Sequence, residues 1–152
     1  MRSDQNPKCC TFHSYKSNKT TLFLQVKYPK FFPIGCPPAD ASPMKMVVFR
    51  MIDGETPAPD DFLPSKIVYP HRKFDDECIA CGVSVFQKFK DLEKRKNRFR
   101  AFRKKNAASG QLHFVSGDVL KTFSASHHTW WIAVNDPYLL FSRISWPVTV
   151  NP

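Results

Sequence analysis

Four polar residues stand where they could carry out acid–base or anion-binding chemistry. They are Arg50 at the end of one hydrophobic run, Ser84 inside a second, and the adjacent His127 and His128. Imidazole exchanges protons near neutral pH, and a guanidinium binds phosphate through paired N–H donors. If one cleft held all four, they would be the catalytic residues of an enzyme that acts on a phosphorylated substrate. The simpler alternative is that one imidazole packs inward, the serine hydroxyl bonds to backbone, and the arginine forms an ion pair.

A second group of candidates lies in residues 88–105. This segment holds ten basic and two acidic residues, within a chain whose formal net charge is +10. Concentrated positive charge favours anionic partners, and contacts to phosphate release counterions without recognising any base. We therefore expect non-sequence-specific binding of nucleic acid, RNA or DNA, through the 88–105 helix. An acidic protein partner and a merely solvated helix face are the alternatives. The candidate contacts are Lys90, Lys94, Arg95, Arg98 and Lys105.

The cysteines indicate neither a metal nor a redox centre. Cys78 and Cys81 form a CxxC motif, but a closed zinc site needs four ligands. The missing ligands would have to be His127 with His128, or Cys9 and Cys10 with Cys36. Adjacent residues on a strand point to opposite faces, so the histidine pair is a poor choice. No metal is therefore predicted, no cofactor is identified, and ordinary reduced cysteines are expected.

The composition also bears on location and partners. An odd cysteine count of five, together with an N-terminus that lacks an apolar leader, favours reduced thiols and a cytoplasmic location. No run of 18 apolar residues occurs, so no membrane partner is expected. The sequence motifs of serine hydrolases, zinc proteases, P-loop proteins and dinucleotide-binding folds are also missing.

The elements that would position these residues follow from hydrophobic patterning. Residues 47–51 and 83–86 are short apolar runs that predict strands. Residues 87–106 contain neither glycine nor proline and are rich in helix formers, so they predict one long basic helix. Further strands are predicted at residues 112–115, 129–134 and 138–144. The expected fold class is α+β, a single domain with a mainly antiparallel sheet on which the basic helix packs.

Aromatic and aliphatic residues of the basic segment predict its buried face. At 100° per residue, five apolar side chains fall within about 200° of arc. They are Phe86, Phe89, Leu92, Phe99 and Phe102. We expect this arc to face the core. The opposite side carries Lys90, Lys94, Arg98 and Lys105. Four further cations project inside or at the edges of the arc and must snorkel, pair with acids or line a site: Lys88, Arg95, Lys96 and Arg103.

Residues 1–43 differ from the remainder of the chain. They hold three of the five cysteines and are interrupted by prolines, whereas Met44 and Met46 directly precede a clear strand. We therefore expect residues 1–43 to be a disordered or mis-translated extension, and residues 44–152 to be the compact domain.

Several short motifs resemble those of known proteins. A group of small bacterial proteins without an assigned function shares an arginine at the end of the first strand, a G-[LI]-S-V-[FY] strand and an H-x-T-x-W strand. The matching residues here are 49–52, 59–62, 82–86 and 128–131. A weaker likeness is to ADP-ribosyltransferases, which implies that Arg50 holds the pyrophosphate of NAD, that Ser84 supports the nicotinamide pocket and that His128 lies nearby. This chain departs from that family in having no glutamate after Glu93. That departure favours a phosphate-transferring or purely binding relative.

Overall fold

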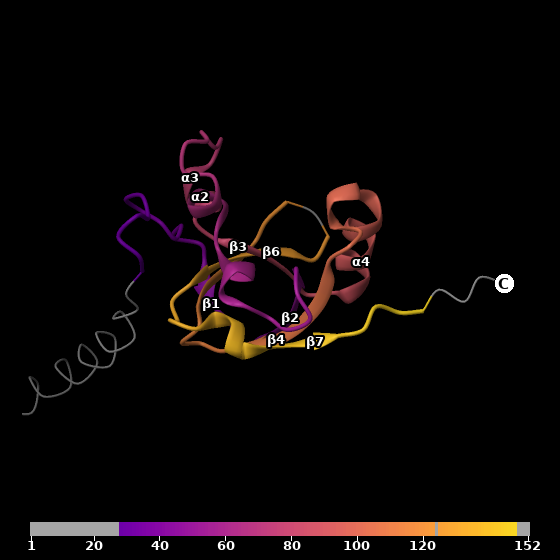
Figure 1. Cartoon of the computed structure of the whole chain (residues 1–152). Coiled ribbons are helices and arrows are strands. Elements are labelled where there is room, and N and C mark those ends of the chain that lie inside the picture. The colour runs from indigo at the N-terminus through magenta and orange to yellow at the C-terminus, as the bar shows by residue number, and fades with distance from the viewer. Residues whose placement is uncertain (1–27, 124, 149–152) are drawn as a thin grey trace, which may run out of the picture.

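A computed structural model describes residues 28–123 and 125–148. They form a seven-stranded sheet in which every neighbouring pair is antiparallel, in the order β1-β5-β6-β3-β2-β4-β7 (Figure 1). The strands are β1 (Ser42–Pro43), β2 (Met46–Ile52), β3 (Val83–Phe86), β4 (Asn106–Leu112), β5 (Gly117–Lys121), β6 (His127–Ile132) and β7 (Phe141–Ile144). The predicted α+β class is confirmed.

The helices are short and are inserted between the strands. The α-helices of the described residues are α2 (Ser65–Val68), α3 (Glu77–Ala80) and α4 (Phe89–Arg98). The 3-10 helices are η1 (Pro59–Phe62), η2 (Arg100–Phe102) and η3 (Pro137–Leu140). In Figure 1, α2 and α3 rise at one end of the sheet and α4 at the other, with β3 and β6 between them. None of the helices in the described ranges has the length and apolar character needed to cross a membrane.

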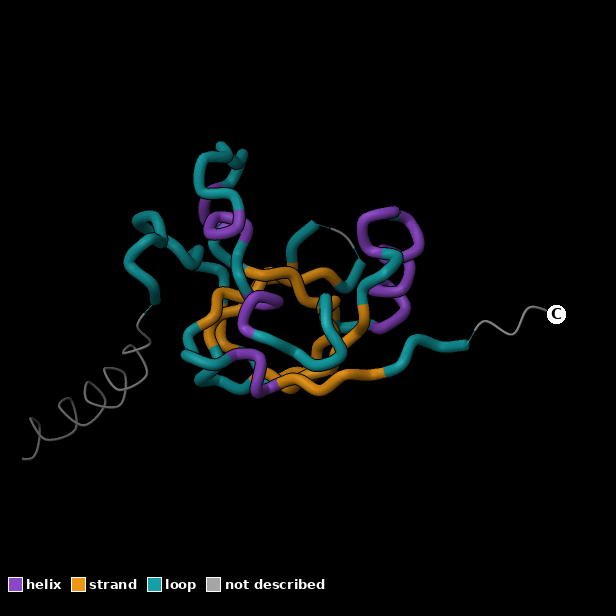
Figure 2. Tube along the Cα trace, in the orientation of Figure 1, coloured by secondary structure: helices purple, strands orange, loops and turns teal. Residues whose placement is uncertain are grey.

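The sheet curls around a single main core. Trp130 on β6 and Phe141 on β7 are separated by four steps in the strand order, which in a flat sheet would place them about 19 Å apart. Their ring centroids are only 6.1 Å apart, and Phe62 of η1 contacts both rings. The sheet therefore curls so that its inner face encloses the main core, and Figure 2 shows the strands bending around this core.

A smaller core lies on the outer face, under α4. Phe86 and Leu92 are buried there, and Phe89 packs against Phe49 and Trp146. These apolar contacts attach α4 to β2 and β3. Because Leu92 is the one fully buried residue of α4, the helix is held along one side only and turns its polar side to solvent.

The basic segment differs from its prediction. The helix ends at Arg98 rather than at residue 106, and Phe99 is extended, with φ −109° and ψ 120°. The helix was predicted to end at residue 106 and a strand to begin at residue 112, whereas residues 106–112 all form β4, which pairs with β2 from Ile52↔Asn106 to Met46↔Leu112. Pairing with β2 holds Asn106, the last residue of the predicted helix, in the sheet, and residues 99–105 connect α4 to β4 through η2. The predicted buried arc is correspondingly wrong at its end, because Phe99 is exposed and Phe102 is half-buried.

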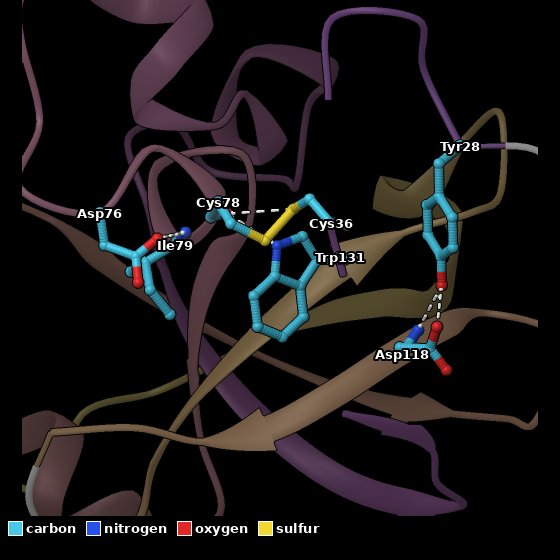
Figure 3. Close-up of a disulfide and its surroundings, with 7 residues drawn as sticks. All are labelled: Tyr28, Cys36, Asp76, Cys78, Ile79, Asp118 and Trp131. Carbon is cyan, nitrogen blue, oxygen red and sulfur yellow. Dashed lines mark hydrogen bonds between the residues drawn. A yellow bond between two sulfur atoms is a disulfide. The ribbon is translucent and has the colours of Figure 1, made fainter. Parts of the chain in front are cut away.

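Residues 28–43 belong to the fold, contrary to the predicted boundary at residue 44. A disulfide joins Cys36 to Cys78 in α3 (Figure 3), and β1 pairs with β5. The Tyr28 hydroxyl donates to the Asp118 carboxylate at 2.6 Å and accepts from the Asp118 backbone N–H at 3.0 Å. This part of the predicted extension therefore packs on the domain, while residues 1–27 lie outside the described residues.

Candidate functional site

A cleft of about 690 Å³ opens on the outer face of the sheet. Its floor is made by β3 and β6, and its two walls by the α2–α3 region and by α4 with η2. These are the two helical projections that stand on either side of β3 and β6 in Figure 1. Ser84 and Thr129 are on the floor, Arg95 and Phe102 are on one wall, and Tyr69 is on the other.

Hydrogen bonds connect a chain of polar side chains on the floor of this cleft. The Oγ of Ser84 lies 2.9 Å from Nε2 of His127, and Nδ1 of the same ring lies 2.9 Å from Oγ1 of Thr122. Oγ1 of Thr122 also lies 2.8 Å from Oγ1 of Thr129. Ser84 is exposed to the cleft, whereas His127 is 3% exposed. An accessible hydroxyl therefore bonds to a buried imidazole that is fixed on both sides.

Strand register brings Ser84 and His127 together. β3 and β6 pair as Ser84↔Thr129 and Phe86↔His127, so the serine and the histidine lie diagonally on one face of the sheet. Gly82 permits this close pairing, since a Cβ at that position would come 2.3 Å from Cγ2 of Thr129. The site thus depends on two adjacent strands in one exact register.

The imidazole of His127 is held in its neutral form. Burial lowers its pKa from the ordinary 6.5 to about 4, and the positive charge of Arg95 acts in the same direction. A neutral ring has one donor and one acceptor nitrogen. In the tautomer protonated at Nδ1, that nitrogen donates to Thr122, and Nε2 can accept the proton of Ser84.

Arg50 lies beside the same serine and serves chiefly to hold the backbone. β2 and β3 pair only at Phe49↔Phe86, and the guanidinium of Arg50 bonds to one carbonyl of η1 and one of β3. Its Nε donates to the Asp61 carbonyl at 2.7 Å, and its Nη1 donates to the Ser84 carbonyl. Burial lowers its pKa to about 10, which leaves it a cation at neutral pH. Arg50 therefore joins β2, η1 and β3 and fixes the position of Ser84.

His128 does not belong to the cleft floor. It pairs with Val85, whose side chain is in the main core on the inner face, so alternation directs its ring away from Ser84. Its Nδ1 lies 2.9 Å from the Ser126 carbonyl oxygen. Of the four residues expected in one cleft, the structure brings together Arg50, Ser84 and His127, and places His128 on the opposite face.

The cysteines also differ from the expectation of reduced thiols. Cys78 is disulfide-bonded to Cys36, and Cys81 is a buried free thiol whose pKa is raised, chiefly by burial. Among the described residues, no group of three or more potential ligands could hold a metal ion. Of the two cysteines in the CxxC motif, Cys78 therefore forms a disulfide and Cys81 is a buried core residue.

The basic residues of α4 remain largely free of acidic partners. Lys90, Lys94, Arg95 and Arg98 are exposed. Within the described ranges, the segment 88–105 has two ion pairs, Lys94–Asp91 at 3.8 Å and Lys105–Asp53. Lys105 is therefore the weakest of the predicted contacts, because its ammonium is already paired. The remaining cations face solvent or stack on aromatic rings.

Two features of this surface were not predicted. The guanidinium of Arg95 lies 5.3 Å from the ring centre of Phe99 and 5.9 Å from that of Phe102, in a cation–π cluster beside the cleft. A hollow of about 520 Å³ at the start of α4 is lined by Lys88, Lys90, Lys94 and Lys121. The alternation of arginine and phenylalanine was a visible signal for the cluster, but its exposure depended on where the helix ends.

Thr122 was also missed as the second partner of His127. A single threonine at the end of a strand gives no signal in the sequence, since its role depends on the return of the chain from β5 to β6. No family model matches the chain, and no curated protein or solved structure shows significant similarity to it.

Proposed function

We propose that the protein binds single-stranded nucleic acid, with backbone phosphates along α4 and bases against the aromatic cluster at its end. The observation that carries this proposal is the row of exposed cations on α4, Lys90, Lys94, Arg95 and Arg98, of which only Lys94 has a carboxylate partner in the described ranges. Each lysine or arginine that contacts a phosphate releases condensed counterions. A row of such cations therefore binds a polyanion more tightly than it binds a ligand with a single charge.

Two neighbouring features support the same ligand. The four lysines of the hollow at the start of α4 could hold one phosphate group, and Asp91, the acid that lines the hollow, is engaged with the Ser126 backbone N–H at 3.2 Å. At the other end, the exposed ring of Phe99, with Arg95 over it, offers a surface on which a base could stack. Stacking on aromatic rings suits unpaired bases and tolerates any sequence.

The test is fluorescence anisotropy of the full chain with labelled oligo-U, oligo-dT and a duplex of equal length, over a series of salt concentrations. We expect single strands to bind most tightly and the logarithm of the binding constant to fall linearly with the logarithm of salt. The variant Lys90→Gln/Lys94→Gln/Arg98→Gln should lower the magnitude of that slope by about 2, since each single-strand contact contributes about 0.7.

A matched control removes the same charge elsewhere. Lys30, Lys45 and Lys73 are exposed and lie outside α4, so the variant Lys30→Gln/Lys45→Gln/Lys73→Gln should keep the slope of the unmodified chain. Equal weakening by both variants would indicate diffuse attraction without a binding surface. Absence of binding at low salt would refute the proposal and would indicate that the polar side of α4 is only a solvated surface.

NAD and an acidic protein are the alternative ligands. For NAD, the observation that counts against a pyrophosphate contact is that Nε and Nη1 of Arg50 already bond to carbonyls. A rise in melting temperature with millimolar NAD, but not with oligonucleotide, would favour the ADP-ribosyltransferase-like enzyme. Competition by polyglutamate as effective as that of oligo-U would favour an acidic protein.

A cytoplasmic location is retained as part of the proposal, because nucleic acid is abundant there. The Cys36–Cys78 disulfide is the observation against it, since cytosolic thiols are normally kept reduced. Alkylation of free thiols during cell lysis, followed by mass analysis of the intact chain, decides between the two. Modification of both Cys36 and Cys78 supports the cytoplasm, and protection of both supports an oxidising compartment.

A further inference from the structure

Strand alternation places Ser84 on the outer face of β3. Its neighbours Val83 and Val85 are buried on the inner face, whereas Ser84 is exposed on the floor of the cleft and its hydroxyl bonds to a buried imidazole. A hydroxyl within 2.9 Å of a histidine nitrogen, with the other ring nitrogen held by a third group, is the arrangement that activates a serine nucleophile. Here the third group is the hydroxyl of Thr122 instead of a carboxylate.

We propose that Ser84 is a nucleophile activated by His127, and that the cleft transfers the phosphoryl group of a phosphate ester first to Ser84 and then to water. The choice of a phosphate ester rests on the proposed affinity of the adjoining α4 surface for phosphate. The pairing of nucleophile and base rests on the geometry of the cleft alone.

Each step of this reaction balances with the groups present. The Oγ of Ser84 attacks phosphorus and passes its proton to Nε2 of His127. The Oγ–P bond forms, the P–O bond to the leaving group breaks, and the leaving alkoxide takes the bonding pair and the proton from the imidazolium. A water molecule then attacks the phosphoserine and gives its proton to His127, and Ser84 leaves with that proton restored.

Arg95 connects the cleft with the basic surface. It lines the wall beside Ser84, and its charge contributes to the low pKa of His127, as do those of Arg50 and His128 to a lesser degree. A phosphate bound beside Arg95 would offset this positive charge and raise the pKa of the imidazole towards neutrality. The base would therefore become stronger when substrate is present, which is the state in which catalysis needs it.

Arg50 and Thr122 act as positioning residues in this scheme. Arg50 holds the Ser84 carbonyl, and Thr122 holds Nδ1 of His127 and is itself held by Thr129. A hydroxyl stabilises an imidazolium less than a carboxylate does, so we expect slower turnover than in a serine–histidine–aspartate enzyme. Replacing Thr122 by Val should shift the pH profile of Ser84 labelling, a change that a purely structural role would not produce.

The first test treats the full chain with a fluorophosphonate probe and maps the modified peptide by mass spectrometry. Attack by Ser84 on this probe forms the Oγ–P bond and expels fluoride. The matched control within the same molecule is Ser142, which is also an exposed strand serine but has no histidine partner among the described contacts. We expect Ser84 to be labelled and Ser142 not, and the label to disappear in Ser84→Ala but not in Ser142→Ala.

The second test addresses the base and the substrate. His127→Gln should slow labelling of Ser84 about 100-fold, the lower end of the range for general base catalysis. The unmodified chain should release p-nitrophenolate from bis-p-nitrophenyl phosphate, and Ser84→Ala should not. If His127→Gln fails to fold, the comparison of Ser84 with Ser142 in the native chain still decides whether the serine is activated.

The outcomes separate this proposal from nucleic-acid binding. Equal labelling of Ser84 and Ser142 would overturn the nucleophile while leaving the oligonucleotide affinity of α4 untouched. Labelling of Ser84 without release of p-nitrophenolate would overturn phosphoryl transfer. Labelling and release in a chain that binds no oligonucleotide would uphold the enzyme and refute the proposed function.

Discussion

The indole N–H of Trp131 donates a hydrogen bond of 2.8 Å to the carbonyl oxygen of Cys78, the residue that the disulfide joins to Cys36 (Figure 3). Trp131 is fully buried on β6. One wall of the cleft is therefore attached twice, to the sheet through Trp131 and to the N-terminal segment through Cys36. This double attachment leads to the first prediction.

Loss of the disulfide should lower stability substantially. The two cysteines are separated by 42 positions, and a cross-link of this span limits the unfolded chain by about 4 kcal/mol. We expect Cys36→Ser to reduce the free energy of unfolding in urea by that order. Dithiothreitol should destabilise the unmodified chain to the same extent and leave the variant unchanged. If dithiothreitol lowers the free energy of unfolding of the unmodified chain and of Cys36→Ser equally, the disulfide is not the cause of the destabilisation.

Arg50 should prove important for stability as well as for the site. Its guanidinium donates two charge-assisted hydrogen bonds to carbonyls of Asp61 and Ser84, and each such bond contributes about 1.5–3 kcal/mol. Arg50→Met should therefore lower the free energy of unfolding by about 3 kcal/mol or more, and Arg50→Lys by less. Arg100→Met, at an exposed position of η2, is the control and should change little. A neutral Arg50→Met variant would contradict the bonding described.

The buried His127 should make stability depend on pH. Its folded pKa of about 4 lies below the ordinary 6.5, so between these values the unfolded chain binds the proton that the folded chain excludes. Stability from this group is complete above pH 6.5 and falls as the pH drops towards 4. We expect a loss of about 2 kcal/mol between pH 7.5 and pH 5.

Urea unfolding at pH 7.5, 6.5, 5.5 and 5 measures this dependence. The depressed pKa values of the carboxyls Glu77 and Asp91 act only at lower pH, outside the window chosen. The charged groups that act on the imidazole, Arg95 and Arg50, remain cations throughout, and His128 is kept in both chains that are compared. His127→Gln should remove most of the slope, and an unchanged slope would assign it to other groups.

The sequence predicted the class of fold better than its elements. β3 was predicted at its observed bounds, because a short run of Val, Ser, Val and Phe after a glycine has little alternative to a buried strand. The single helix predicted over 87–106 was wrong at its C-terminal part, because composition favours a helix throughout, whereas α4 ends at Arg98 and the chain passes through η2 into β4, which pairs with β2. Local propensity could not reveal a partner about 60 residues earlier in the chain.

The site was predictable in its residue types and not in its geometry. Ser84 and His127 were chosen for their chemistry, and the register Phe86↔His127 is what joins them. That register also separates His128 from the group, since one step along a strand reverses the face. The pairing of Cys36 with Cys78 could not be predicted for the same reason, because the spacing of five cysteines does not indicate which segments of the chain meet.

The two-residue strand β1 has a consequence for how the molecules behave towards one another. Ser42 and Pro43 cover the outer side of β5, and Pro43 has no backbone N–H with which to continue a ladder. A chain that began at Met44 would leave Asp118 and Val119 without this partner, so that the edge of β5 could pair with a strand from a second molecule. Residues 28–43 thus cover part of an edge strand that could otherwise pair with a second molecule. Removing them should favour dimers and larger aggregates.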